Sequence, residues 1–222
     1  MQHQLFAQHA DAERLILFFN GWAMTPESVT HLSLPPGHDL AVVWDYRDDH
    51  LELDCSRYEG ISLVAWSMGV WAADRLSAQL SQLPLERGIA LCGTGRPMDD
   101  LHGIPVEIFA GTLAGLNEAN RKRFNRRMCG GKIYAHLLKA LERRSTEEIR
   151  QELERVQTLE LAEEQHSPAS PLWTKAWVAG EDRIFPAANQ LRYWQGAGVE
   201  TSYEAEAAHY FMGGKTCWQE LW

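Results

Sequence analysis

Short apolar runs, each closed by turn residues, recur along the chain and constrain its fold more than any other feature. No unbroken run exceeds five residues, whereas a membrane span takes about 20. The runs are rich in β-branched and aromatic residues, which is typical of strands buried on both faces of a parallel sheet. They occupy residues 14–19, 40–44, 61–66, 88–92, 175–179 and 199–203. Stretches with helical spacing fall between several runs, most clearly at 68–83 and 186–194. This alternation predicts an α/β fold with a mostly parallel sheet and helices on both faces.

The segment 94–173 has no strong strand pattern, apart from an ambiguous run at 106–109. A structureless loop of that length is implausible inside a compact domain. Two helical signals occur instead. An apolar repeat at i, i+3, i+4 and i+7 starts at Tyr134, and Ser145 and Glu148 form the pattern of a capping box.

The stretch 167–171 has the composition of a linker and closes this helical segment. We therefore predict a mainly helical lid at 94–173, inserted into a core made of 1–93 and 174–222. In an open α/β sheet the crevice lies at the carboxyl ends of the strands, so we expect the lid to roof that crevice.

The net charge is −9, which disfavours general affinity for nucleic acid or anionic membranes. The segment 117–144 is the exception, with nine Lys or Arg against two Glu and a net charge of +7. Phe124 and Met128 form an apolar row along the same predicted helix. A solvated face is the commoner explanation of a charge run, but a local excess on an acidic protein would also steer an anionic macromolecule. We expect this helix to turn the apolar row inward and its cations outward, and to bind a small acidic carrier protein, not nucleic acid. The expected binding residues are Arg121, Lys122, Arg123, Phe124, Arg126 and Arg127.

The four cysteines include no C-x-x-C pair, so we predict reduced thiols and no zinc site. They are Cys55, Cys92, Cys129 and Cys217. The N-terminus has neither a cationic start nor a long apolar stretch, so no secretory signal is predicted. We expect a cytoplasmic monomer that does not associate with membranes.

A serine follows the predicted strand 61–66 on a sharp turn into a helix. The sequence A-W-S-M-G at 65–69 approximates the nucleophile-elbow pattern G-x-S-x-G, with alanine at the first glycine. A serine nucleophile needs a histidine base that a carboxylate orients, and in folds with this elbow the order is Ser, acid, His. Asp182 follows a late strand and His209 follows the last one. We predict that they form a catalytic triad with Ser67.

Each of these residues also has an ordinary structural interpretation. Ser67 could cap the following helix, Asp182 could be a turn residue, and His209 could be one of nine histidines with a structural role. Their order and their places after core strands favour the triad. The alternative acids are Glu181, Asp99 and Asp100.

Ester hydrolysis also requires donors for the oxyanion, usually two backbone N–H groups. Met68, the residue after the nucleophile, is the expected source of one. The second should come from the loop after strand 14–19, where Gly21 permits a turn and the Trp22 N–H is our candidate. Gly21 could alternatively be a simple turn at the strand end.

Four motifs stand out together: N-G-W at 20–22, L-V-A-W-S-M-G at 63–69, G-E-D-R-I-F-P at 180–186 and A-H-Y-F at 208–211. Combined, they resemble the BioG type of pimeloyl-acyl-carrier-protein methyl ester esterase, an α/β-hydrolase of biotin synthesis, over nearly the whole chain. The functionally equivalent BioH type has H-G-W-G where this chain has N-G-W-A, and glycine where it has Ala65. Those departures favour the BioG type.

The resemblance implies an α/β-hydrolase fold and hydrolysis of the methyl ester of pimeloyl-acyl carrier protein to pimeloyl-acyl carrier protein and methanol. Serine chemistry of this kind needs neither metal nor cofactor. Docking of the carrier protein should set how deep the acyl chain reaches, so that the distal ester and not the proximal thioester meets Ser67. Two rival functions stay open, namely a general serine hydrolase of small esters or acyl-CoA, and a non-catalytic binding module of the same fold.

Overall fold

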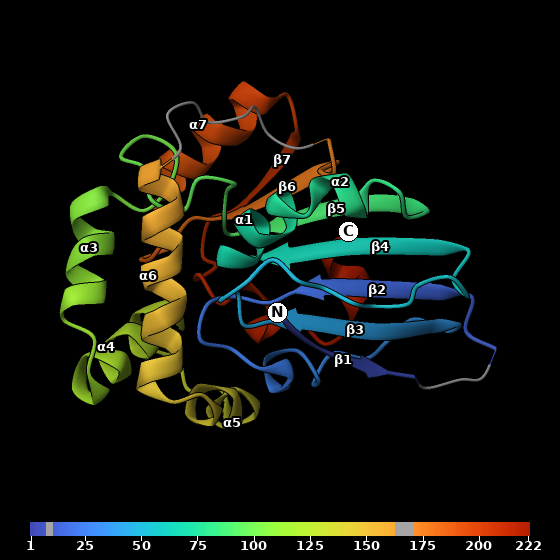
Figure 1. The fold of residues 1–222 in the computed structure, drawn as a ribbon, viewed down its shortest axis with the longest axis horizontal. Coiled ribbons are helices and arrows are strands. Elements are labelled where there is room, and N and C mark those ends of the chain that lie inside the picture. Colours follow the sequence, from blue (N-terminus) through green and yellow to red (C-terminus); the bar gives the residue numbers. More distant parts are fainter. Residues whose placement is uncertain (8–10, 163–170) are drawn as a thin grey trace.

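A computed structural model describes residues 1–7, 11–162 and 171–222. These residues form a sheet of seven strands in the order β1-β3-β2-β4-β5-β6-β7 (Figure 1). Every neighbouring pair of strands is parallel except β1 and β3, which confirms the predicted mostly parallel α/β architecture. The strands are β1 Gln2–Phe6, β2 Arg14–Phe19, β3 His38–Trp44, β4 Gly60–Trp66, β5 Leu85–Leu91, β6 Lys175–Ala179 and β7 Glu200–Glu204.

The central strands are almost continuously apolar, as expected for strands with both faces covered. All seven residues of β4 are buried, as are residues 15–19 of β2. Strand β1 was not predicted, since its side chains are mostly exposed and form no apolar run. It lies at the edge of the sheet and pairs with β3 from Gln2 opposite Trp44 to Phe6 opposite Leu40. An edge strand needs backbone partners more than a hydrophobic sequence.

Three α-helices connect core strands, namely α1 Met68–Arg75 and α2 Ser77–Leu80 between β4 and β5, and α7 Ala187–Ala197 between β6 and β7. The single helix predicted at 68–83 is broken at Leu76, which separates α1 from α2. Helix α1 packs on β4 and β2, and α7 packs on β6 and β7. Gly198 ends α7 in the left-handed conformation, with φ of 69°, which glycine adopts without strain. Short 3₁₀ helices η1 Pro26–Ser28, η2 Phe211–Gly214 and η3 Trp218–Leu221 complete the fold.

Four further helices gather beyond the carboxyl ends of the parallel strands, at the left of Figure 1. They are α3 Val106–Ala114, α4 Glu118–Met128, α5 Ala135–Arg143 and α6 Thr146–Ala162. All four lie within 94–173, and the ambiguous run at 106–109 belongs to α3. The predicted linker at 167–171 lies outside the described residues, apart from Pro171. The division into a core at 1–93 and 174–222 and a lid at 94–173 stays a prediction.

The start of α6 has the capping box that the sequence predicted. The Glu148 carboxylate accepts the Ser145 N–H at 2.8 Å, and Ser145 Oγ accepts the Glu148 N–H at 3.2 Å. Farther along α6, Glu160 Oε1 accepts the indole N–H of Trp71 at 2.9 Å, which ties this helix to α1. Within the described ranges, no helix is long and apolar enough to cross a membrane.

Candidate active site

Ser67 lies at the turn between β4 and α1, with φ of 58° and ψ of −125°. Such a positive φ is strained for a non-glycine residue and projects the side chain out of the turn. The turn is tightly enclosed. A Cβ at Gly69 would lie 2.3 Å from the Phe19 carbonyl oxygen, and a Cβ at Gly93 would lie 2.3 Å from the Ser67 carbonyl oxygen. The Ser67 hydroxyl does not cap α1 but faces His209, so the geometry disfavours the capping interpretation.

The structure brings the three predicted triad residues together. His209 Nε2 lies 2.9 Å from Ser67 Oγ, and His209 Nδ1 lies 2.8 Å from Asp182 Oδ2. The side chains of His209 and Asp182 are 2% and 0% exposed, so bulk water does not compete for these contacts. Ser67 itself is buried. The geometry is that of a nucleophile, a base and a residue that orients the base.

The Asp182 carboxylate is surrounded by donors. Oδ1 accepts the backbone N–H groups of Ile184 and Phe185 at 2.8 and 2.9 Å, and Oδ2 accepts Gln190 Nε2 at 3.0 Å as well as contacting His209. Both oxygens are therefore fixed in place. No sequence pattern points to Gln190, because a lone glutamine inside a helix carries no distinguishing signal.

The imidazole of His209 is held on two sides by aromatic rings. Phe185 stacks on it with a centroid distance of 5.9 Å, and the Trp66 ring lies 5.4 Å away. The Trp66 indole N–H also donates to the His209 carbonyl oxygen at 2.8 Å. These contacts restrict rotation of the ring away from Ser67.

The alternative acids lie in other contacts. Asp99 Oδ1 accepts backbone N–H groups of its own turn, while Oδ2 pairs with Arg96 at 3.1 Å. Asp100 accepts the Val106 N–H at the start of α3, and Glu181 is exposed. The contact to His209 belongs to Asp182.

The two predicted oxyanion donors border the same cavity as Ser67. This narrow cavity has a volume of about 40 Å³, and its lining includes Trp22, Ser67 and Met68. Among the described residues, the backbone N–H groups of Trp22 and Met68 have no hydrogen-bond acceptor. The Trp22 side chain is fixed, since its indole N–H donates to the Ile149 carbonyl at 2.8 Å and its ring packs edge-on against Phe124 at 5.0 Å.

A groove of about 420 Å³ between α3 and α4 adjoins the cavity at Ser67. The two hollows share the lining residues Trp22, Ile108, Thr112, Phe124 and Arg127. The groove and the Ser67 cavity therefore meet at side chains that line both hollows.

The basic residues of α4 separate into two sets. Exposed Arg123 and Arg127 line the groove next to the Ser67 cavity, together with half-buried Phe124. Exposed Lys122 and Arg126 line a different hollow, of about 970 Å³, between α4 and α5.

Arg121 departs from the expectation that its side chain faces outward. It is buried, and its guanidinium donates to the carbonyl oxygens of Arg144 at 2.7 Å and Leu141 at 2.5 Å. Arg121 is buried because α4 turns its side chain toward the C-terminal end of α5, where backbone carbonyls without helical partners attract a cation.

The described part of the chain has no cluster of three or more His, Cys, Asp or Glu residues that could hold a metal ion. Its four cysteines are free thiols.

Comparison with known proteins assigns the chain to a family. Residues 1–221 match the family model described as BioG, pimeloyl-ACP methyl esterase. An uncharacterised protein of Haemophilus influenzae is 43% identical over 212 residues, which make up 95% of this chain and 94% of that one. A malonyl-[acyl-carrier protein] O-methyltransferase of Bacteroides fragilis is 43% identical over 201 residues, 88% of this chain but only 39% of that longer protein.

Comparison with solved structures gives the same family. The crystal structure of BioG from Haemophilus influenzae, a selenomethionine protein, superposes with a TM-score of 0.87 and 39% identity, and each chain is covered completely. An esterase from Exiguobacterium antarcticum, with a TM-score of 0.68 and 11% identity over 95% of this chain and 88% of that one, shares the α/β-hydrolase fold. The chain is thus an α/β-hydrolase of esterase type, and it belongs to the BioG family of pimeloyl-ACP methyl esterases.

Proposed function

We propose that this protein hydrolyses the methyl ester of pimeloyl-acyl carrier protein to pimeloyl-acyl carrier protein and methanol, as a step of biotin synthesis. The observation that carries the proposal is the continuous hydrogen-bonded chain from Ser67 through His209 to Asp182 in a member of the BioG family. Ser67 is the proposed nucleophile, His209 the general acid and base, and Asp182 the residue that orients the imidazole.

The first half of the reaction forms an acyl-enzyme. Ser67 Oγ attacks the ester carbonyl carbon while its proton passes to His209 Nε2, 2.9 Å away. The carbonyl oxygen becomes an oxyanion, which the N–H groups of Trp22 and Met68 would stabilise. When the tetrahedral intermediate collapses, the C–O bond to methoxide breaks and His209 returns the proton, so methanol leaves.

The second half repeats the sequence with water. His209 removes a proton from a water molecule that attacks the acyl carbon, and the Ser67 oxygen leaves and takes the proton back. The product is a free carboxyl at the distal end of the acyl chain. One oxyanion donor is typically worth about 10² to 10³ in kcat, so the two proposed N–H groups would supply a large share of the rate.

We further propose that the carrier protein docks beside the groove between α3 and α4. Arg123 and Arg127 offer positive charge at the groove that adjoins the Ser67 cavity. The partner would then deliver its acyl chain through the groove, and the fixed docking point would set which carbonyl reaches Ser67. Lys122 and Arg126, which line the hollow on the α5 side, would contribute to long-range attraction more than to positioning.

The name of the Bacteroides fragilis relative is consistent with this substrate class. That protein is named for methyl transfer to malonyl-[acyl-carrier protein], and 39% of its length resembles this chain. Formation of a methyl ester on a carrier-bound acyl chain creates the bond that the proposed reaction later removes.

The direct test is to measure methanol release from pimeloyl-acyl carrier protein methyl ester and, in parallel, hydrolysis of a short nitrophenyl ester. We expect a much higher kcat/KM on the carrier-bound substrate, and complementation of a biotin auxotroph that lacks its demethylating esterase. Equal efficiency on both substrates without complementation would favour the general hydrolase. Ser67→Ala that still complements would favour the binding module.

Charge reversal tests the docking proposal. Arg123→Glu should raise KM for the carrier-bound ester and leave the nitrophenyl ester little affected, whereas Arg126→Glu on the other side of α4 serves as the matched control with a smaller effect. Raising the ionic strength should raise the same KM, because salt screens charges at a surface. A KM that is insensitive to both salt and Arg123→Glu would contradict docking at this groove.

A further inference from the structure

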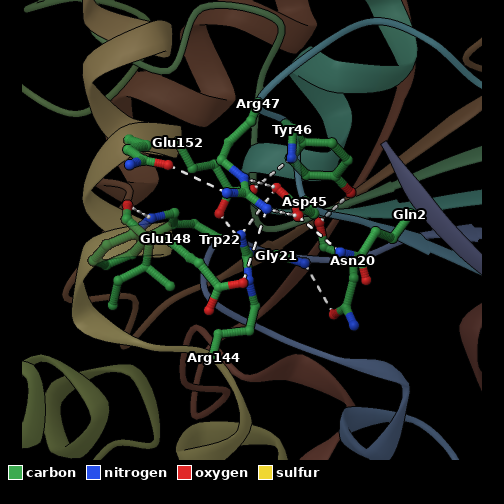
Figure 2. A network of polar contacts seen from close by, with 12 residues as sticks. Gln2, Asn20, Gly21, Trp22, Asp45, Tyr46, Arg47, Arg144, Glu148 and Glu152 are labelled. Carbon is green, nitrogen blue, oxygen red and sulfur yellow. Dashed lines mark hydrogen bonds and ion pairs between the residues drawn. The ribbon is translucent and has the colours of Figure 1, made fainter.

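The loop that carries the proposed oxyanion donor Trp22 is held by a buried polar network that reaches α6 (Figure 2). Tyr46 is its centre, in the turn that follows β3. The Tyr46 hydroxyl donates to the Asn20 carbonyl oxygen at 2.7 Å, and the ring is completely buried. Asn20 is the residue directly after β2, where the loop begins.

The backbone on both sides of Gly21 is fixed by hydrogen bonds. The peptide between Asn20 and Gly21 has its oxygen on the Tyr46 hydroxyl and its N–H on Asn20 Oδ1 at 2.9 Å. The next peptide has its oxygen on the Met24 N–H at 3.3 Å. The N–H of that second peptide is the Trp22 donor. Its direction therefore depends on the first peptide, which Tyr46 holds.

Tyr46 is in turn held from the helical segment. Its backbone N–H donates to Glu152 Oε1 at 2.9 Å, and Glu152 Oε2 accepts Arg144 Nη1 at 2.6 Å. Arg144, between α5 and α6, also forms an ion pair with Asp45 at 3.1 Å. Glu152 is 0% exposed and Arg144 is 5% exposed, so the charges pair with one another inside the protein and not with water.

A purely stabilising role is a poor explanation for these buried charges. Desolvation costs several kcal/mol per buried ion, and apolar side chains of the same volume often stabilise a protein at least as well. Glu152 bears this cost, since burial raises its pKa and Arg144 only partly offsets the effect. Apolar packing, however, could not bind a backbone N–H. The charged pair can, and it thereby fixes the turn at Tyr46.

We propose that Tyr46 is a positioning residue for the oxyanion hole, and that Glu152 and Arg144 seat it, so that the placement of α6 sets the direction of the Trp22 N–H. This proposal rests on the proposed function, because it takes Trp22 as an oxyanion donor. A second link points the same way, since the Ile149 carbonyl, one turn before Glu152 in α6, accepts the Trp22 indole N–H at 2.8 Å.

The proposal predicts a loss confined to the transition state. A misdirected N–H still permits substrate to bind but no longer meets the oxyanion, so kcat falls while KM stays the same. Removing an oxyanion donor outright costs about 10² to 10³ in kcat, so loss of its positioning should cost about ten- to a hundredfold.

The test uses the full chain with Tyr46→Phe and Glu152→Gln. Tyr58→Phe is the matched control, because Tyr58 is also buried and its hydroxyl donates to Asp39 at 2.9 Å, at the amino end of β3. Kinetics are measured on a nitrophenyl ester, which needs Ser67 and the oxyanion hole but no carrier protein. Inhibition is measured with a heptyl trifluoromethyl ketone, whose carbonyl carbon bonds to Ser67 Oγ while the serine proton passes to His209. The matching amide is measured in parallel, because it binds the same pocket without forming a bond to Ser67.

We expect both variants at Tyr46 and Glu152 to lose kcat about ten- to a hundredfold at similar KM, and to bind the ketone more weakly by the same factor. Binding of the amide and all properties of Tyr58→Phe should stay near wild type. If Tyr46→Phe does not fold, Glu152→Gln carries the same test from the α6 side. Three results would overturn the positioning role: a rise in KM with unchanged kcat, unchanged binding of the ketone, or an equal fall in kcat in Tyr58→Phe.

The outcome is separable from that of the proposed function. If the wild type hydrolyses the nitrophenyl ester through Ser67 but not the carrier-bound ester, the proposed substrate is wrong. The kinetics of the Tyr46 and Glu152 variants on the nitrophenyl ester then still test the positioning role. If no ester is hydrolysed in a Ser67-dependent manner, both proposals are overturned.

Discussion

Replacing Asp182 by asparagine should disable the proposed triad by changing which nitrogen of His209 carries the proton. Asp182 Oδ1 accepts two backbone N–H groups, at 2.8 and 2.9 Å, and those donors cannot move without breaking the turn. Asparagine has a single carbonyl oxygen, which would take this position. Its NH₂ group would then face His209 Nδ1, which would have to act as an acceptor.

The magnitude follows from that rearrangement. With Nδ1 as an acceptor, the neutral ring carries its proton on Nε2, 2.9 Å from Ser67 Oγ, so it cannot receive the serine proton. The corresponding change in serine proteases lowers kcat about 10⁴-fold, or about 5 kcal/mol of transition-state stabilisation. The new side chain would also place its NH₂ near the amide of Gln190, a further unfavourable contact between donors.

The assay is steady-state hydrolysis of a nitrophenyl ester, with the carrier-bound methyl ester as a second substrate. We expect kcat of Asp182→Asn to fall by about 10⁴ on both substrates at near-constant KM. Asp99→Asn is the matched control, since that carboxylate pairs with Arg96 and His102 and not with His209. Retention of more than about a tenth of kcat, or an equal loss in Asp99→Asn, would refute the assignment of Asp182.

Three further predictions concern the elbow and the half-buried acid Asp74. Ser67→Ala and His209→Ala should each lower kcat by several orders of magnitude, and the double variant should lower it no further, because the two residues act as one unit. Steady-state hydrolysis rates of the three variants test this, and losses that add up in the double variant would contradict it. Gly69→Ala should destabilise the fold by about 1–3 kcal/mol in urea unfolding, because its Cβ would lie 2.3 Å from the Phe19 carbonyl; wild-type stability would show that the elbow has room. Burial raises the pKa of Asp74 to about 7, so between this value and its unfolded pKa the native state keeps a proton that the unfolded state has lost. Wild-type stability should therefore fall as pH rises through that window, by up to about 1.4 kcal/mol per pH unit, and Asp74→Asn should flatten the fall; identical urea midpoints against pH in both proteins would refute this.

The order of strands and helices was predictable because burial on both faces imposes long apolar runs. Six of the seven strands, β2 to β7, each share at least four residues with a predicted run. Strand β1 escaped because an exposed edge strand needs no apolar sequence. The break at Leu76 escaped because apolar spacing continues across it.

The triad candidates were predictable for a different reason. Residues that follow successive parallel strands are delivered to one edge of the sheet, so Ser67, Asp182 and His209 could be proposed as neighbours although Ser67 and His209 are 142 positions apart. Glu152 is different, because the sequence around it does carry a signal. It interrupts the apolar stripe of Ile149, Leu153 and Val156 on α6, and a charged residue on a buried helix face needs a charged partner.

The sequence by itself determined the layering of the fold, the strained serine turn and the excess of positive charge on α4, since each is a local property of residue type and spacing. Only the tertiary structure decided which of those cations face the groove at Ser67, that Arg121 is buried on carbonyl oxygens, and that Tyr46 joins α6 to the loop of Trp22. The physical reason is that periodicity records whether a side chain is buried. Which partner it meets depends on how segments distant along the chain pack together, and no local pattern contains that information.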